Sequence, residues 1–135
     1  MNGQHTISIA VLTDDQDDVA FINGTLRDAG HRAHCHWVNR PETLSDTLGA
    51  HDVEVLILNC DRYADSIRQV VKQKERFIPE VPVIALAENA DENAIQQALL
   101  HGACDLVSMG RKRRLQAVVS RELRALRVER ALNST

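Results

Sequence analysis

Short apolar segments alternate along this chain with longer stretches in which apolar residues recur every three or four positions. The short segments are rich in aliphatic and β-branched residues, which is typical of β-strands. The longer stretches have the periodicity of amphipathic α-helices. The pattern predicts strands at 6–13, 31–38, 52–58, 81–86 and 103–108, and helices at 19–29, 41–48, 65–77, 91–100 and 111–131.

Polar residues, glycines and a proline mark the ends of the predicted helices. We expect Asp17 or Asp18 to cap the first helix, because a side-chain oxygen there accepts a hydrogen bond from a free backbone N–H. Gly30 and Gly102 are expected to follow the first and fourth helices, and Pro79 the third.

Side-chain direction follows from the same periodicities. In the second strand, Cys35 and Trp37 are predicted to face the core. In the fourth helix, Ile95, Ala98 and Leu99 are predicted to point inward.

The order of elements predicts the fold class. Strand and helix alternate five times, which favours right-handed crossovers and a single parallel sheet. We therefore predict an α/β, flavodoxin-like doubly wound sheet of five strands in the order 2-1-3-4-5, with five helices and an extended last helix.

Length and composition narrow the class of protein. The chain has 135 residues, of which 44% are hydrophobic and 3% aromatic, so one domain with an aliphatic core is expected. The chain has no apolar run long enough to span a membrane and no apparent secretory signal. The three scattered cysteines fit a reducing compartment. We expect a cytoplasmic protein that does not bind membranes.

Charge is distributed unevenly along the chain. Residues 1–110 hold 8 Lys and Arg against 17 Asp and Glu, whereas residues 111–135 hold 8 against 2. A basic tail can be a nucleic-acid arm, but this one has helical periodicity and no aromatic residue for stacking on bases. We favour the solvated face of a terminal helix and expect no nucleic-acid partner.

The most apolar strand ends in a polar turn, at 59–61. Ligands and chemistry in open α/β sheets gather at the carboxyl ends of central strands. The residue at that position is Asn59, and an amide is a poor nucleophile that carries no negative charge. The sequence therefore favours a function other than catalysis.

Several short motifs, in their order and spacing, resemble the receiver domain of bacterial response regulators (CheY-like proteins). They are the acidic cluster at 13–15, the polar residue Asn59 after the third strand, the run Pro-Val-Ile-Ala-Leu at 82–86, and Ala-Leu-Leu-His-Gly-Ala-Cys-Asp at 98–105. The last of these is the most specific. The resemblance covers nearly the whole chain.

The resemblance implies a phosphoryl-accepting site, and this sequence departs from it at most positions. Active receivers hold Mg²⁺ on two acidic residues, phosphorylate an Asp, and contact the phosphate through a hydroxyl and a Lys. The acceptor position here is Asn59, the hydroxyl position Ala87 and the Lys position Met109. The acidic pair falls on Thr13 and Asp14. We expect a degenerate receiver that accepts no phosphate.

The stretch 91–126 more narrowly resembles the N-terminal receiver-like domain of FimX-type proteins. These are multidomain proteins with receiver, PAS, GGDEF and EAL modules that act in cyclic-di-GMP signalling and twitching motility. The run Val-Val-Ser-Arg-Glu-Leu at 118–123 and the Met-Gly pair at 109–110 carry the likeness. It implies that any cyclic-di-GMP site lies in other modules of a longer chain.

The acidic residues near Asn59 allow an alternative chemistry at the same edge. Asp61 could be a displaced phosphoryl acceptor, with Mg²⁺ at Asp14 and Asp15. We favour the simpler interpretation that Asp14, Asp15 and Asp61 form a vestigial acidic pocket without metal or other cofactor. Cys60 is expected to be a buried structural thiol. The histidines His31, His34 and His36 are expected on the polar face of a strand, not as metal ligands.

The last helix is predicted to dock through Leu115, Val118, Val119, Leu123 and Leu126 and to run past the domain body. We predict a receiver-like domain at 1–125 and a helical extension at 126–135 toward a following module. Arg121, Arg124, Arg127 and Arg130 recur every three residues and are expected on its exposed side.

The receiver resemblance implies an interaction face made of the fourth helix, the fifth strand and the last helix. We expect this face to bind a partner protein or a second copy, giving a module for protein interaction, dimerisation or localisation that is not itself an enzyme. Its expected residues are Leu99, Asp105, Arg114, Val118, Arg121, Leu123, Arg124 and Leu126.

Overall fold

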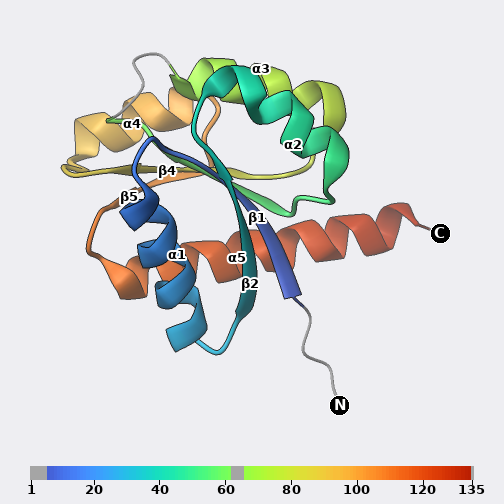
Figure 1. The fold of residues 1–135 in the computed structure, drawn as a ribbon, viewed down its shortest axis with the longest axis horizontal. Helices are drawn as coiled ribbons and strands as arrows, with labels where there is room; N and C mark the ends of the chain where they lie inside the picture. Colours follow the sequence, from blue (N-terminus) through green and yellow to red (C-terminus); the bar gives the residue numbers. More distant parts are fainter. Residues whose placement is uncertain (1–5, 62–65, 135) are drawn as a thin grey trace.

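The computed structural model describes residues 6–61 and 66–134, which form one parallel β-sheet with helices on both faces (Figure 1). The spatial order of the strands is β2-β1-β3-β4-β5, which confirms the predicted flavodoxin-like order. The strands are β1 (Thr6–Leu12), β2 (Arg32–Val38), β3 (Val55–Asn59), β4 (Val83–Ala87) and β5 (Asp105–Ser108).

Five α-helices connect and follow the strands. They are α1 (Gln16–Asp28), α2 (Leu44–Ala50), α3 (Ser66–Phe77), α4 (Glu92–Leu100) and α5 (Lys112–Asn133). The second predicted helix begins as a 3-10 turn, Pro41–Thr43, before it becomes α2. Asp65, the predicted start of the third helix, lies outside the described residues.

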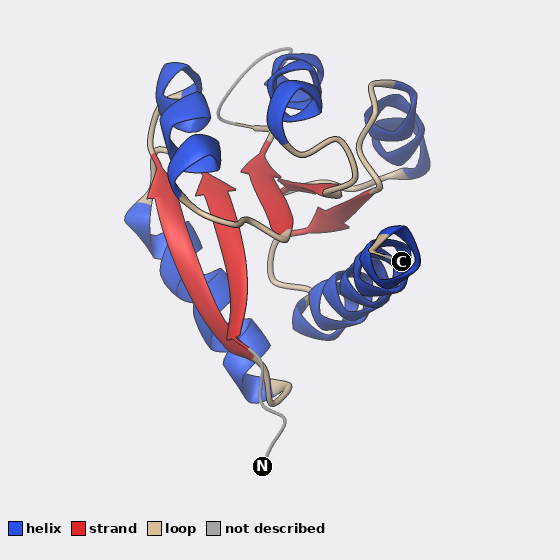
Figure 2. Cartoon of the chain, turned by 90° about the vertical axis from the view of Figure 1, so that its right-hand side faces the viewer, coloured by secondary structure: helices blue, strands red, loops and turns tan. Residues whose placement is uncertain are grey.

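The sheet separates two apolar layers, as Figure 2 shows in cross-section. Helices α1 and α5 pack on one face of the sheet, and α2, α3 and α4 pack on the other. Successive side chains of β3 alternate between these layers: Val55 and Ile57 join α1 and α5, whereas Leu56 and Leu58 join the other three helices. Burial on both faces explains why this strand is a continuous apolar run.

The first helix is capped by a residue that lies before both predicted caps. Asp15 is its N-cap, and its carboxylate accepts a hydrogen bond from the backbone N–H of Asp17 at 2.9 Å. Asp18, the other predicted cap, is buried instead. Its side chain is in phase with Ile22 and Leu26 on the inner stripe of α1, and this inward direction overrides its capping preference.

Two predictions of inward-facing side chains are wrong. Trp37 is 45% exposed, because it lies near the end of edge strand β2, where its indole N–H donates to the Thr13 carbonyl at 2.8 Å. Leu99 is 49% exposed, because α4 is short and buries only Ala98 fully. The exposed Leu99 is consistent with its other predicted place, on the interaction face.

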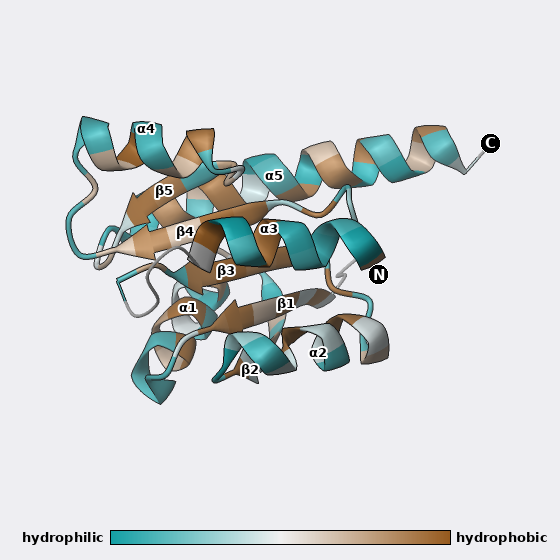
Figure 3. Cartoon of the chain, turned by 90° about the horizontal axis from the view of Figure 1, so that it is seen from above, coloured by the Kyte–Doolittle hydropathy of each residue, from teal (hydrophilic) through white to brown (hydrophobic). Residues whose placement is uncertain are grey.

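Helix α5 is the longest element and reaches beyond the other elements at its C-terminal end (Figure 3). Its 22 residues span roughly 33 Å at 1.5 Å per residue. Across residues 6–61 and 66–134, no helix combines the length and the apolar character needed to cross a membrane.

Candidate functional site

Parallel strands end at a common edge, so the residues at their carboxyl ends come together. Asn59 ends β3, Ala87 ends β4, Ser108 ends β5, and Thr13 directly follows β1. The strand register places Ala87 beside Ser108. The sequence therefore predicted correctly which strand ends meet at this edge.

A hollow of about 310 Å³ opens at this edge. Among the residues that the structure describes, those that line it are Asp18, Asn59, Asp61, Glu88 and Met109. Three of these five carry carboxyl groups and none of the five carries a positive charge. We call these five residues the acidic hollow.

Asn59 is held rigidly at the base of the acidic hollow. It is 5% exposed, and its side-chain amide donates a hydrogen bond to Oδ2 of Asp18 at 2.8 Å. Its Oδ1 accepts the backbone N–H of Asp61 at 3.1 Å. Both ends of the amide are therefore engaged within the protein, and no atom of Asn59 can form an acyl phosphate.

Asp18 has a role at this site that the sequence pattern did not indicate. This carboxylate is 7% exposed and accepts hydrogen bonds at Oδ2 from the Thr13 hydroxyl, at 2.6 Å, and from Asn59. Charge-assisted bonds of this kind compensate the cost of burying a carboxylate. The signal that could have found it is helical phase, since Asp18 stands one turn before the buried Ile22.

Of the three residues predicted for the vestigial acidic pocket, one lines the acidic hollow. Asp61 lines the acidic hollow, but Asp14 and Asp15 do not: Asp14 is exposed, and Asp15 caps α1. The Oδ2 of Asp61 accepts the backbone N–H of Glu88 at 2.6 Å, so this carboxylate ties the end of β3 to the loop after β4. In the described ranges, no three His, Cys, Asp or Glu side chains are placed to hold a metal ion together.

The positions that contact phosphate in active receivers are apolar here. Ala87 is 4% exposed, and Met109 packs against the core beside α5 while its backbone N–H donates to the Ala87 carbonyl at 2.8 Å. The nearby hydroxyl of Ser108 is used internally, because it donates to the Glu88 carbonyl at 3.0 Å. Neither Ala87 nor Met109 offers a polar side chain to an anion.

Cys60 is partly buried, whereas the sequence predicted a buried structural thiol. Burial and then the neighbouring Asp61 carboxylate raise its pKa. Its Sγ donates to the Leu86 carbonyl at 3.2 Å. A thiol that stays protonated at neutral pH lacks the thiolate that nucleophilic chemistry requires.

The three histidines weighed as metal ligands, His31, His34 and His36, lie in two environments. His31 lies against α5, with its Nε2 3.1 Å from the Ser120 hydroxyl. His34 and His36 lie on one face of β2, with ring centroids 4.5 Å apart, and His36 stacks on His51 at 3.9 Å. The sequence pattern did not indicate that His51, after α2, joins this pair.

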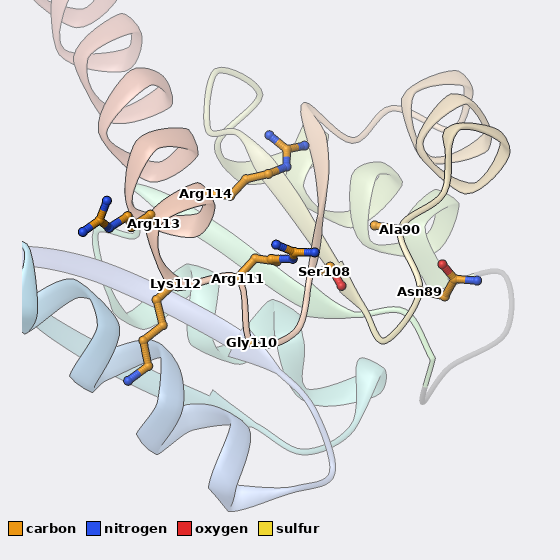
Figure 4. Close-up of a pocket in the computed structure, with 8 residues that line it drawn as sticks. All are labelled: Asn89, Ala90, Ser108, Gly110, Arg111, Lys112, Arg113 and Arg114. Carbon is orange, nitrogen blue, oxygen red and sulfur yellow. The ribbon is translucent and has the colours of Figure 1, made fainter.

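A second hollow lies beside the first, at the start of α5, and it is basic (Figure 4). It is lined by residues 110–114 together with Ser108, Asn89 and Ala90. In Figure 4, Arg111 extends toward Asn89, whereas Lys112 and Arg113 extend away from it. The basic side chains therefore do not converge on one anion.

The predicted interaction face contains a cluster of charges centred on Asp105. Its two carboxylate oxygens lie 2.9 Å from Arg114 and 3.3 Å from Arg121. Arg121 also pairs with Glu122 at 2.8 Å. This cluster joins β5 to α5, and the use of the face for binding stays a prediction.

Three residues predicted for that face belong to the core. Val118, Leu123 and Leu126 are 2%, 4% and 2% exposed, because they continue the inner stripe by which α5 docks on the sheet. Of the residues predicted there, Leu99, Arg114, Arg121 and Arg124 are exposed, and Asp105 is half-buried.

The arginines of α5 do not share one exposed side. A three-residue spacing drifts around a helix, since three residues fall short of a full turn. Arg121 therefore meets Asp105, whereas Arg127 lies 3.4 Å from Glu54 and Arg130 lies 3.1 Å from Glu80. These last contacts tie the helix after residue 125 to the body, and the domain division at 125 stays a prediction.

Comparison with known proteins gives matches among solved structures alone. No family model matches the chain, and no curated protein matches it. Brucella abortus NtrX in complex with ADP superposes with a TM-score of 0.78 at 19% identity, over 96% of this chain and 29% of the NtrX chain. This chain thus spans less than a third of that protein's length.

Two further similar structures match over nearly their whole length. The receiver domain of a putative LuxO repressor protein from Vibrio parahaemolyticus has a TM-score of 0.77 at 15% identity, covering 95% of this chain and 98% of that one. A response regulator from Thermotoga maritima has a TM-score of 0.74 at 16% identity, covering 88% and 98%. Together with the strand order, these likenesses show that the chain has the receiver fold of bacterial response regulators.

Proposed function

We propose that this chain is a pseudo-receiver: a receiver-fold module of a two-component or cyclic-di-GMP signalling protein that does not accept a phosphoryl group. The observation that carries the proposal is the acidic hollow. An amide stands at the acceptor position, and the surrounding side chains of Asp18, Asp61 and Glu88 are acidic.

Electrostatics supports this proposal independently of the acceptor residue. A transferring phosphoryl group is stabilised by cations placed around it. None of the five described residues of the acidic hollow is a cation that could stabilise an incoming phosphoryl group. Met109 and Ala87 replace a charge and a hydroxyl by apolar groups, so a single reversion at Asn59 would not rebuild the site.

The proposed role is protein interaction through the face that Leu99, Asp105, Arg114, Arg121 and Arg124 share. A second copy or a partner protein binds there, without cofactor, nucleic acid or membrane, in the cytoplasm. The subtype we propose is FimX-like, in a longer chain that acts in twitching motility or biofilm formation. The likeness of residues 91–126 and the Met-Gly pair at 109–110 support it.

A titration with beryllofluoride and Mg²⁺ tests the pseudo-receiver proposal. Beryllofluoride mimics a phosphoryl group on a reactive aspartate, and backbone amide NMR reports where it binds. We expect the amide resonances of Asn59, Asp61, Glu88 and Met109 to stay unshifted at concentrations that saturate an active receiver. Saturable shifts that disappear in Asp61→Asn would instead support a displaced acceptor at Asp61.

A further inference from the structure

The C-terminal half of α5 exposes an apolar stripe on the side away from the sheet. Val128 and Leu132 are 55% and 71% exposed, and Ala125 is exposed as well. The docking residue Leu126 is buried at 2% in the same stretch, so the stripe is a separate face of the helix. We call Ala125, Val128 and Leu132 the α5 seam.

The spacing of the α5 seam is that of a coiled coil. Its members are three and four residues apart, which matches successive a, d and a positions of a heptad. Arg124 stands directly before the first seam position and Glu129 directly after the second, which are the flanking g and e positions. Both flanking side chains are exposed, and neither has an ion pair within the described chain.

The two flanking charges cannot meet within one helix. Residues five positions apart point in directions about 140° apart on a helix of 3.6 residues per turn. In a parallel pair of helices, however, a g residue lies beside the e residue five positions later on the partner. Arg124 of one copy then faces Glu129 of the other, twice in a symmetric dimer. An antiparallel pair would bring like charges together instead.

We propose that a second copy of this chain docks on the α5 seam, so that the two α5 helices form a short parallel coiled coil. The proposal rests on the proposed protein-interaction function and names its partner and its geometry. The charge complementarity of Arg124 and Glu129 selects a second copy in parallel register. Toward the start of α5 the seam ends, because the next a position of the heptad is Val118, which is buried in the core.

Sedimentation equilibrium of the chain up to about 1 mM, the concentration at which weak association becomes measurable, tests the proposal. We expect a weak monomer–dimer equilibrium, since the seam is short. Arg124→Glu should weaken the dimer about three- to tenfold, because it places two like-charged pairs across the seam. Glu129→Arg should weaken it similarly, and the double charge reversal should restore it.

A second pair of variants tests the apolar positions of the seam. Leu132→Asp should weaken the dimer about tenfold or more, because it removes an apolar side chain from the seam of both copies. Asn133→Asp adds the same charge one residue later, off the seam, and should leave the dimer constant unchanged. Circular dichroism before each run checks that the fold is intact.

Three results would overturn the coiled coil. The first is a monomer at every concentration, and the second is a dimer constant that does not change in Leu132→Asp. The third is a double charge reversal that does not restore the dimer constant. None of them bears on phosphoryl acceptance, which the beryllofluoride titration measures separately.

Discussion

At the scale of single residues, the acidic hollow depends on a hydrogen bond between an amide and a buried carboxylate. Asn59 and Asp18 are both buried and lie 2.8 Å apart. An aspartate at position 59 would place two carboxylates at hydrogen-bond distance, where they cannot both be ionised without large repulsion. The amide at position 59 is therefore matched to Asp18.

This match gives the first prediction. Asn59→Asp should lower the free energy of unfolding by about 1–3 kcal/mol at neutral pH, the usual cost of a buried polar group that loses its partner. The pKa of the new carboxyl pair is raised in the folded state, so the deficit should be larger at pH 7.5 than at pH 5. Urea denaturation of the variant and the parent at both values of pH measures it.

The exposed Asn89→Asp serves as the control, because it adds the same charge outside the buried pair. An Asn59→Asp deficit that matches this control, or that does not change with pH, would remove the proposed coupling to Asp18.

Gly102 gives a second prediction at this scale. Its φ is +106°, and a Cβ built there would lie 3.1 Å from both methyl carbons of Val71. Gly102→Ala should therefore destabilise the protein by about 1–2 kcal/mol, from the left-handed backbone alone. Gly24→Ala is the matched control: the position is helical and open, so alanine should stabilise by about 0.5–1 kcal/mol. Melting temperatures that shift in the same direction for both variants, relative to the parent, would contradict this explanation.

At the scale of elements, β2 and α2 are joined by the imidazoles of His34, His36 and His51. Burial lowers the pKa of His36, and the neighbouring His51 and His34 lower it further. Ser8, on the adjacent β1, lies 3.0 Å from its Nε2. The folded protein therefore favours the neutral form of His36 more than the unfolded chain does.

The third prediction follows from this shift. Because the folded pKa of His36 lies below its ordinary value of 6.5, the unfolded state binds the proton first as pH falls. Stability should decrease on acidification through and below pH 6.5. Denaturant midpoints at pH 7.5 and 5.5 should show this loss, and His36→Gln should reduce it. A loss of equal size in His36→Gln would assign the pH dependence to other groups.

In the second half of α5, the contacts in the structure differ from those that the sequence predicted. Leu126 is buried in the core, and Arg127 and Arg130 reach the acidic residues Glu54 and Glu80. The spacing of leucines and valines predicted the apolar stripe by which the helix docks. It did not predict the charge contacts, because these depend on loops that are distant in sequence.

A fourth prediction measures how far the docked part of α5 extends. Leu126→Ala should destabilise the protein by about 2–5 kcal/mol, as for other fully buried leucines. Val128→Ala, two residues later but 55% exposed, should change stability by less than about 0.5 kcal/mol. Equal effects in chemical denaturation would mean that the helix after residue 125 packs differently from the arrangement described.

At the scale of the whole molecule, hydrophobic periodicity was sufficient to predict the strand order and both helical layers. It was sufficient because parallel strands buried on both faces leave few alternative topologies. The placement of Asn59 at the edge followed from the same topology, whereas Ala87 and Met109 were assigned to it by the receiver resemblance. Asp18 was missed because its role comes from a tertiary hydrogen bond, and Asp14 was misplaced because it follows β1 without turning inward.

The whole molecule thus combines a receiver fold with a strand edge at which an amide and two apolar side chains occupy the positions that handle phosphate in active receivers. Asp18, Asp61 and Glu88 line the acidic hollow, and the basic residues 111–114 line the second hollow at the start of α5. Negative charge and an engaged amide at one edge leave the charged face of α5 as the surface proposed for signalling.

Intact-mass spectrometry after incubation with acetyl phosphate and Mg²⁺, with an active receiver treated in parallel, measures directly whether this chain accepts a phosphoryl group. We expect an unmodified mass for this chain under conditions that phosphorylate the active receiver. A phosphoryl adduct that disappears in Asp61→Asn would contradict the account and would make the acidic hollow a working switch with a displaced acceptor.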